Sequence, residues 1–414
     1  MLFRSGLVLA LAAFAIRAAV VLATGPSQPR FPDARPYLFA ARSLASTGTY
    51  PLRTEAFLFR PPGYPFFLAV ATLGHPESIA ACRLATAAAG ALVPVVLAAL
   101  SARIFRRRGL AVATGALAAV HPAFVLVSIG IQSEALFLVF VLASGFLLLA
   151  ASDRPSSNLA ILSGAGLALA ALTRSSALSL VPFLAAPLFD SRHPRRVNAH
   201  VVGSALLGFV LVLGPWTVRN ALVFRELIVV NDGAGYLFYG RKSEAALGVA
   251  RARDRAELQQ AAAELERSRA RVVESLPEDV RRSPGKLSRA LTDAALAQRR
   301  ADPAGTLFLM RWETWSWLRP YPDPLFWSRG VVVGLGIAVS ILDVLAAIGL
   351  TRASRRGCVR FCVAVLAATM LLHVAMGASW RYRTTSWDPI LILYGAFGAA
   401  TVRANRRSPE IAAA

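Results

Sequence analysis

Long apolar stretches alternate with polar segments along this chain. A transmembrane helix needs about 20 apolar residues, and about ten stretches approach that length. They cover residues 5–24, 79–102, 109–129, 132–151, 159–173, 175–189, 198–218, 330–350, 358–378 and 387–403. The stretches at 159–173 and 175–189 are short and meet at Arg174, so they form a tight hairpin or one kinked element. The pattern predicts an all-α polytopic membrane protein.

Arginines gather in the short loops between these stretches. If the N-terminus is cytoplasmic, every cluster lies on the cytoplasmic side. The clusters contain Arg103, Arg106, Arg107, Arg108, Arg154, Arg192, Arg195, Arg196, Arg352, Arg355, Arg356, Arg403, Arg406 and Arg407. We therefore expect a multi-pass protein of the cell (inner) membrane with both termini in the cytoplasm. The segment from Arg4 to Gly25 also resembles a cleaved signal peptide, but Arg17 within it disfavours that alternative.

Two longer segments face outward in this topology. The predicted organisation is an N-terminal transmembrane module (1–218) with an external catalytic loop (25–78), an external, largely helical segment (219–328), C-terminal transmembrane helices (329–407) and a tail (408–414). We expect juxtamembrane helices in the first loop. The polar region from Glu244 to Arg300 predicts amphipathic helices that end at Pro277, Pro284 and Pro303. These helices are either solvated or lie on anionic headgroups.

The composition supports a membrane protein. Hydrophobic residues make up 56% of the chain and charged residues 16%, against about 45–50% and 25% in soluble proteins. The formal net charge of +22 fits orienting loops and anionic lipids, so it does not call for nucleic acid. The cysteines lie in apolar stretches and predict no disulfide framework. No nucleotide-binding, metalloprotease or hydrolase motif occurs.

Polar clusters mark the outward ends of the predicted spans. Asp33 precedes a helical pattern that ends at Gly48, and it is either functional or a helix N-cap. The segment from Arg60 to Pro65 predicts a turn into an interfacial helix. Glu134 starts a span, where it is either a paired functional acid or a carboxylate stabilised by the helix dipole.

Four arginines that are distant in sequence share the outward side in this topology. They are Arg174, Arg219, Arg381 and Arg383. Guanidinium groups suit phosphate binding, although a single one at a helix end more often anchors the helix. Their placement beside Asp33 and Glu134 predicts a site for an anionic ligand. Arg17 and Asp343 are isolated charges within predicted spans.

The order of these segments resembles the polytopic membrane glycosyltransferases that use polyprenyl-phosphate-linked sugars. This superfamily includes protein O-mannosyltransferases and lipid A aminoarabinose transferases. The resemblance rests on Asp33 with Tyr37, Pro61-Pro62-Gly63-Tyr64-Pro65, Ser133-Glu134, Leu172-Thr173-Arg174, Pro215-Trp216-Thr217-Val218-Arg219-Asn220, Asn231-Asp232-Gly233 and Arg381-Tyr382-Arg383.

The resemblance implies an inverting glycosyltransferase. It would move a sugar from a polyprenyl-phosphate-linked donor to an acceptor hydroxyl at the external, periplasmic membrane face. Asp33 is the implied catalytic base, and arginines would stabilise the departing phosphate. The implied substrate-binding residues are Tyr37, Arg60, Tyr64, Glu134, Arg174, Arg219, Arg381, Tyr382 and Arg383.

Several alternatives stay open at this point. The acceptor is a lipid, a polysaccharide or a protein, and membrane lipids are further expected partners. No cofactor is certain and a divalent cation remains an alternative; His121 is either a ligand or a packing residue. A transporter or flippase for a lipid-linked or anionic substrate, or a non-catalytic envelope scaffold, would also span the membrane. A transporter should carry polar residues at the bilayer midplane, whereas here polarity concentrates on the external side.

Overall fold

The chain folds into a helical bundle in a computed structural model. The structure describes residues 2–29, 31, 33–51, 60–320, 328–352, 357–377 and 380–412. Within these ranges the side chains of residues 2, 3, 358, 370, 373–377, 380, 381 and 404–412 lie outside the description. The described residues contain helices and no strand, so the predicted all-α class is confirmed.

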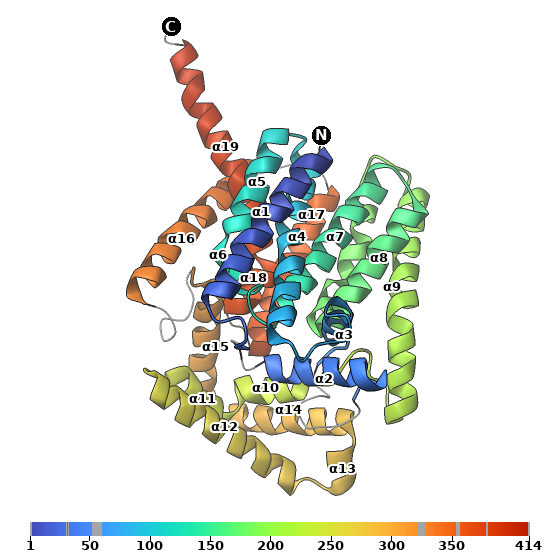
Figure 1. The fold of residues 1–414 in the computed structure, drawn as a ribbon, viewed down its shortest axis with the longest axis vertical. Helices are drawn as coiled ribbons and strands as arrows, with labels where there is room; N and C mark the ends of the chain where they lie inside the picture. The colour runs from blue at the N-terminus through green and yellow to red at the C-terminus, as the bar shows by residue number, and fades with distance from the viewer. Residues whose placement is uncertain are drawn as a thin grey trace.

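Upright helices form the upper part of the molecule (Figure 1). They include α1 (Leu2–Ala23), α4 (Ile79–Phe105), α5 (Arg108–Val120), α6 (Pro122–Leu126), α7 (Glu134–Asp153), α8 (Ser157–Thr173), α9 (Arg195–Phe224), α16 (Arg329–Arg352), α17 (Gly357–Gly377) and α19 (Asp388–Ala412). A 3-10 helix, η1 (Ser175–Phe189), follows α8, and the short α18 (Trp380–Ser386) precedes α19. Both marked chain ends lie at the top of the view in Figure 1.

Helices from the two long loops gather at the lower end, where α2, α10, α11, α12 and α14 run across the bundle (Figure 1). The first loop forms α2 (Ala34–Thr47) and α3 (Gly63–Ala71). The second forms α10 (Ala234–Lys242), α11 (Glu244–Arg251), α12 (Arg255–Ser275), α13 (Glu278–Arg282), α14 (Pro284–Ala301) and α15 (Pro303–Leu318). The predicted proline breaks are confirmed, because Pro277 precedes α13 while Pro284 and Pro303 open the next two helices. Proline suits a helix start, where its missing N–H would have no helical partner.

Five helices of the described residues are long and apolar enough to cross a membrane. They are Arg4–Ala23, Ile79–Phe105, Glu134–Asp153, Arg195–Phe224 and Arg329–Arg352. Four of the other predicted spans correspond to shorter apolar helices, Arg108–Val120, Ser157–Thr173, Ser175–Phe189 and Val359–Thr369. The count of about ten stays a prediction. The stretch predicted at 109–129 is divided into α5 and α6 at His121, because Pro122 cannot continue the hydrogen-bond ladder of α5. The stretches that meet at Arg174 form two separate helices, α8 and η1.

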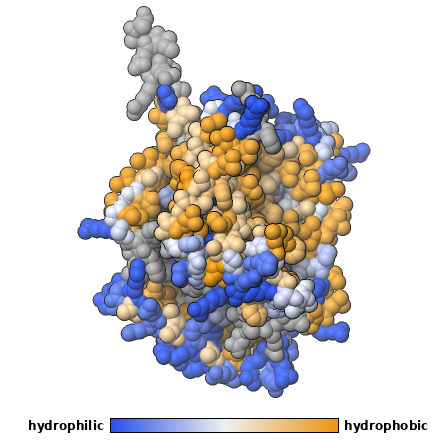
Figure 2. All heavy atoms as spheres, viewed as in Figure 1, coloured by the Kyte–Doolittle hydropathy of each residue, from blue (hydrophilic) through white to orange (hydrophobic). Residues whose placement is uncertain are grey.

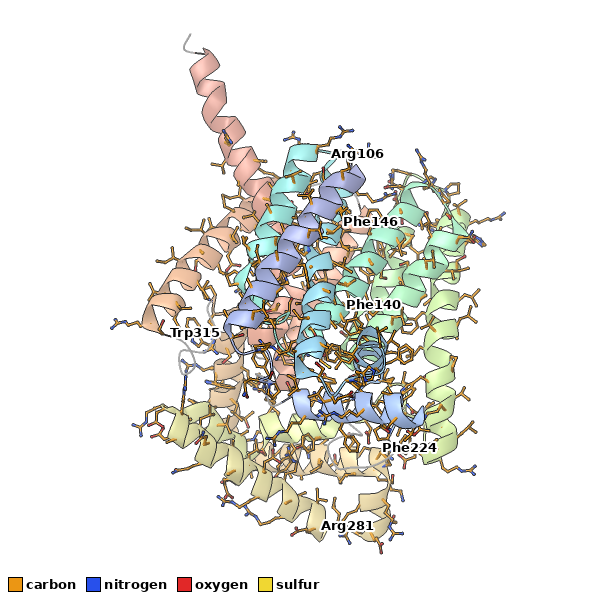
Figure 3. The ribbon with its side chains drawn as sticks, viewed as in Figure 1. Arg106, Phe140, Phe146, Phe224, Arg281 and Trp315 are labelled. Atoms are coloured by element: carbon orange, nitrogen blue, oxygen red, sulfur yellow. The ribbon has the colours of Figure 1, made fainter. Side chains whose placement is uncertain are left out.

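The surface matches this arrangement. Figure 2 shows apolar side chains over the upright helices and hydrophilic side chains at both ends. Arg106 lies at the upper end, whereas Arg281 and Phe224 lie at the lower end (Figure 3). Exposed apolar side chains on α1, α9 and α16, such as Leu11, Leu211 and Ile337, belong to this band. An apolar belt between polar ends indicates an integral membrane protein.

Helices α8 and α9 touch each other backbone to backbone. A Cβ atom added to Gly164 of α8 would lie 1.7 Å from the Ala205 carbonyl oxygen of α9. A Cβ added to Gly208 would lie 2.0 Å from the Ile161 carbonyl oxygen. Only glycine permits this spacing, which is typical of helix contacts within membranes.

Of the two charges predicted to be isolated within spans, Asp343 has a charged partner, so the prediction is wrong for this residue, whereas Arg17 bonds only to backbone carbonyls among the described residues. Arg17 donates from Nη1 to the carbonyl oxygens of Ala13 and Ala119. Asp343 accepts hydrogen bonds from the Arg383 guanidinium at 2.9 Å. The partner of Asp343 lies 40 residues further along the chain, and local sequence does not reveal such a pairing.

Candidate functional site

Asp33 lies where the first loop enters α2. It occupies the N-cap position, but its side chain makes no capping hydrogen bond. Instead, its Oδ1 accepts a hydrogen bond from Arg60 Nη2 at 2.6 Å, and 28% of the Asp33 side chain remains exposed. The predicted end of this helix is confirmed, since Gly48 follows α2 with a φ of 69°. Asp33 is therefore an ion-paired and accessible carboxylate rather than a cap.

The Arg60 guanidinium contacts both Asp33 and the ring of Tyr37. Its guanidinium lies 5.0 Å from the centre of the Tyr37 ring. Its backbone carbonyl accepts a hydrogen bond from the Tyr50 hydroxyl at 2.8 Å. Burial lowers the pKa of Arg60, but the nearby Tyr37 and Asp33 raise it by more, so the group is firmly cationic.

Tyr37 and Tyr64 are buried beneath this pair. Their rings meet edge to face with centres 4.8 Å apart. The Tyr37 hydroxyl lies 3.0 Å from Ser133 Oγ, and the Tyr64 hydroxyl lies 2.7 Å from Thr86 Oγ1. The hydroxyls of both tyrosines thus bond to neighbouring helices and fix the first loop against α4 and α7.

Glu134 and Arg174 form a second ion pair next to Tyr37. Glu134 Oε1 lies 3.0 Å from Arg174 Nη1, and the Glu134 side chain is only 1% exposed. Arg174 also donates to Ser133 Oγ at 3.2 Å, and its guanidinium lies 5.7 Å from the Tyr382 ring centre. Glu134 is therefore a paired acid, and it also lies in the first turn of α7, so the structure agrees with both interpretations of this residue.

Arg219 lies near the lower end of α9, half-buried between the rings of Trp216 and Phe224 at 4.8 and 5.7 Å. It shares a cavity with Arg60, and Tyr50, Trp216 and Asp232 also line it. Burial raises the pKa of Tyr50, whereas Arg219 and Arg60 lower it, so both guanidiniums act on the same phenol. The structure thus places Arg219, a predicted phosphate-binding residue, in one cavity with Arg60, a predicted substrate-binding residue that pairs with Asp33.

Arg383 lies elsewhere, in a buried ion-pair network. Its Nε donates to Asp388 at 3.0 Å, its Nη1 donates to the Leu318 carbonyl, and its Nη2 donates to Asp343. The Arg383 side chain is only 3% exposed. All three nitrogens are thus bonded within the protein, away from the cavity of Arg60 and Arg219. The side chain of Arg381 lies outside the described residues.

Three further side chains of the Pro215–Asn220 segment clamp the loop that follows α9. Asn220 Nδ2 donates to the carbonyl oxygens of Ile228 and Val230 at 3.0 and 3.1 Å. Trp216 Nε1 donates to Val230 at 2.8 Å, and Thr217 Oγ1 donates to Val229 at 2.9 Å. The resemblance includes the whole segment, but a site role was predicted only for Arg219. The four-residue spacing of Trp216 and Asn220, which places both on one helix face, was the available signal.

We expect Asn220→Ala to loosen this clamp. The buried Ile228 carbonyl loses its donor, whereas the Val230 carbonyl keeps the hydrogen bond from Trp216. Leaving a buried carbonyl unpaired typically costs about 1–3 kcal/mol. Trypsin should then cut after the exposed Arg225 about tenfold faster or more. Asn198→Ala is the matched control, because Asn198 makes similar bonds to Asp190 and His193 at the opposite end of α9. Equal cleavage of the two variants would show that Asn220 does not restrain the loop.

Among the described residues, no group of three or more His, Cys, Asp or Glu side chains lies close enough to hold a metal ion. His121, the histidine considered as a ligand, is buried beside Phe124 with its ring centre 4.9 Å from the phenyl centre. No cofactor is established by these residues.

Sequence comparison connects the site to a known family. Residues 59–217 match the family described as dolichyl-phosphate-mannose-protein mannosyltransferase. The predicted resemblance to polyprenyl-phosphate-dependent membrane glycosyltransferases is confirmed. The matched segment includes Arg60, Glu134, Arg174 and Trp216, whereas Asp33 and Arg219 lie outside it. No curated protein matches the chain.

The fold is similar to that of a solved archaeal oligosaccharyltransferase. The oligosaccharyltransferase AglB of Archaeoglobus fulgidus, in complex with an inhibitory peptide and a dolichol-phosphate, has a TM-score of 0.57 and 13% identity over 97% of this chain. A second structure of the Archaeoglobus oligosaccharyltransferase, with Zn and sulfate, has a TM-score of 0.56 and 13% identity over 95% of this chain. This chain covers 52% and 49% of those two chains, or about half their length. ArnT from Cupriavidus metallidurans, bound to undecaprenyl phosphate, has a TM-score of 0.43 and 16% identity over 96% of this chain and 79% of its own. The family match covers residues 59–217, and the solved oligosaccharyltransferase structures share the fold of this chain.

Proposed function

We propose that this membrane protein is an inverting glycosyltransferase that moves a sugar from a polyprenyl-phosphate-linked donor to an acceptor hydroxyl. The observation that carries the proposal is the joint placement of Asp33, Arg60 and Arg219. Arg60, which pairs with Asp33, lines a cavity together with the Arg219 guanidinium. A carboxylate bonded to one of two cations at a cavity would supply the base and the charge stabilisation that transfer from a phosphate requires.

Arg60 and Arg219 would bind the donor phosphate. Both are held against aromatic rings, Arg60 over Tyr37 and Arg219 over Trp216, which orients their guanidiniums while leaving N–H groups for phosphate oxygens. As the sugar–phosphate bond breaks, its electron pair passes to the phosphate. The two cations then stabilise the added negative charge more strongly than they stabilised the ground state.

Asp33 would act as the general base. Once phosphate oxygens engage Arg60, the Asp33 carboxylate becomes available to accept the proton of the acceptor hydroxyl. The acceptor oxygen forms its bond to the anomeric carbon on the face opposite the departing phosphate, so the configuration at that carbon inverts. A base positioned in this way contributes typically about 10²–10⁴-fold to the rate.

The remaining predicted site residues would support these three. Tyr37, Tyr64 and Glu134 are buried and bond to other side chains. We assign them to positioning the first loop, and we assign Arg383 to holding α18 against α16 and α19. Arg174 and Tyr382 face each other beside Glu134 and would bind the donor beyond its phosphate. The acceptor, a lipid, polysaccharide or protein, stays open.

We further propose that the site lies at the external face of the cell membrane. The end of the bundle opposite the site carries both marked chain ends and the basic loop with Arg106 (Figures 1 and 3). Short basic loops remain in the cytoplasm, so the end with Asp33 would face outward. The domain division at residues 218 and 328 remains a proposal on the same basis. No feature of the described residues favours the transporter alternative.

Arg219→Ala tests the donor site. We expect the KM for a polyprenyl-phosphate-linked sugar to rise about 10–100-fold, because one charge-assisted phosphate contact is removed. The measurement is transfer of labelled sugar in vesicles containing the purified protein. Arg281→Ala is the control, since Arg281 lies on α13 at the far lower edge (Figure 3). An unchanged donor dependence in Arg219→Ala would remove this residue from the proposed phosphate site.

A further inference from the structure

Asp232 is a partly buried carboxylate that the proposed mechanism does not use. It follows the loop segment 228–230, which the side chains of Trp216, Thr217 and Asn220 clamp to α9. Its Oδ2 is buried and has no hydrogen-bond partner among the described residues. Leaving a buried acceptor unpaired costs free energy, so such a group in a clamped loop calls for an explanation.

Asp232 forms part of the wall between two cavities. The first is the cavity that contains Arg60 and Arg219. The second lies on the other side of the loop and is lined by Glu226, Ser288 and Arg289 together with the apolar Leu178 and Leu227. A side chain that borders both cavities can contact a molecule in either one.

The polar groups of the second cavity are largely engaged, with two exceptions. Glu226 accepts hydrogen bonds from Ser283 and from the Gly285 backbone N–H, and Ser288 Oγ accepts one from the Gly235 N–H. Asp232 and the exposed Arg289 remain to face a ligand. A carboxylate acceptor opposite a guanidinium donor suits a hydroxyl-bearing molecule, while Leu178 and Leu227 offer it apolar contact.

We propose that the second cavity admits the acceptor substrate and that Asp232 accepts a hydrogen bond from one of its hydroxyl groups. This inference rests on the proposed glycosyltransferase function and adds an acceptor-binding site to it. Asp33 would remove the proton of the reacting hydroxyl, whereas Asp232 would hold the acceptor at the boundary with the donor cavity. The clamp residues on α9 would then link the two substrates, because Arg219 lies on the same helical turn.

The charges around Asp232 predict a pH dependence of acceptor use that can be measured. The charged and titratable groups that share its cavities are Tyr50 and Arg60 of the first loop, Arg219 of α9, Glu226 of its own loop and Arg289 of α14. Burial, with a smaller contribution from Glu226, raises the pKa of Asp232 to about 6. Acceptor use that needs the ionised carboxylate should therefore fall as the pH drops through about 6.

The experiment uses the full-length protein in vesicles made from the source membranes, with labelled hexose on undecaprenyl phosphate as the added donor. In Asp232→Asn we expect transfer to the membrane acceptor to fall about 10–100-fold. The decline near pH 6 should disappear, while binding of undecaprenyl phosphate should not weaken. Asp232→Glu should recover much of the transfer, and Arg289→Ala should raise the acceptor concentration needed. Asp279→Asn, an exposed carboxylate on α13, is the matched control.

Stability separates a binding role from misfolding. The folded pKa of Asp232 lies above its ordinary value, so ionisation of this group weakens the fold as the pH rises towards about 6. Asp232→Asn should therefore be at least as heat-stable as the parent protein at pH 7.5. Unchanged transfer with an unchanged pH profile would overturn the inference, and so would loss of undecaprenyl phosphate binding. Absence of both sugar transfer and sugar release in the parent protein would instead overturn the proposed function.

Discussion

Replacing Asp33 with asparagine is expected to reduce sugar transfer about 10²–10⁴-fold, the usual contribution of a general base. Asparagine has nearly the same shape, but it cannot accept the proton of the acceptor hydroxyl. The carboxylate that pairs with Arg60 at 2.6 Å is also removed. Arg60 is then free for phosphate, so binding of the polyprenyl phosphate should not weaken. A fall in kcat without a rise in the Kd of the donor phosphate is the expected combination.

The control for this variant is Glu77→Gln. Glu77 is an exposed carboxylate that pairs with His75 at the same end of the molecule, so its loss should leave transfer unchanged. The Asp33–Arg60 pair is itself partly exposed, and exposed ion pairs contribute little to stability. The heat stability of Asp33→Asn should therefore match that of the parent protein. Normal turnover in this variant would remove Asp33 from the mechanism.

Replacing Arg383 with glutamine is expected to destabilise the fold by about 3–5 kcal/mol. The change leaves Asp388 buried, at 2% exposure, without its guanidinium partner, and it also removes the partner of Asp343. Removing one member of a buried ion pair costs far more than removing the whole pair. The thermal midpoint of the purified protein should fall strongly, whereas the remaining folded fraction should bind donor phosphate normally.

Neutralising the partners gives the companion test. Asp343→Asn and Asp388→Asn combined with Arg383→Gln should recover much of the lost stability, since no unpaired charge remains. Arg360→Gln, at an exposed position on α17, is the control and should change little. If Arg383→Gln kept the parent's thermal midpoint and lost donor binding, Arg383 would instead be a phosphate ligand.

Local patterns predicted many elements of this fold because their causes are local. The helical pattern between Asp33 and Gly48 predicted α2. The prolines at 277, 284 and 303 predicted the boundaries between helices of the second loop. Hydropathy alone overlooked the break at His121, because α5 and α6 are both apolar. Hydropathy averaged over a window of residues is not sensitive to the missing backbone N–H of Pro122, which ends α5.

Partner choice was harder to predict, because it depends on residues that are distant in sequence. Arg219 and Arg383 have similar surroundings in the sequence, near aromatic residues at the ends of apolar stretches. Only the fold shows that Arg383 meets Asp343, whereas Arg219 opens on a cavity with Arg60. Similarly, the residues near Asp232 in the sequence do not indicate that its Oδ2 atom lacks a hydrogen-bond partner among the described residues.

The glycine contact between α8 and α9 has a consequence for the site. Arg174 ends α8 and Arg219 lies near the end of α9, and both helices run towards the same end of the bundle. The helix backbones are in close contact at Gly164 and Gly208. A larger side chain at either glycine would force the two helices apart and would increase the distance between Arg174 and Arg219. The separation of the two arginines therefore depends on residues that do not contact a substrate.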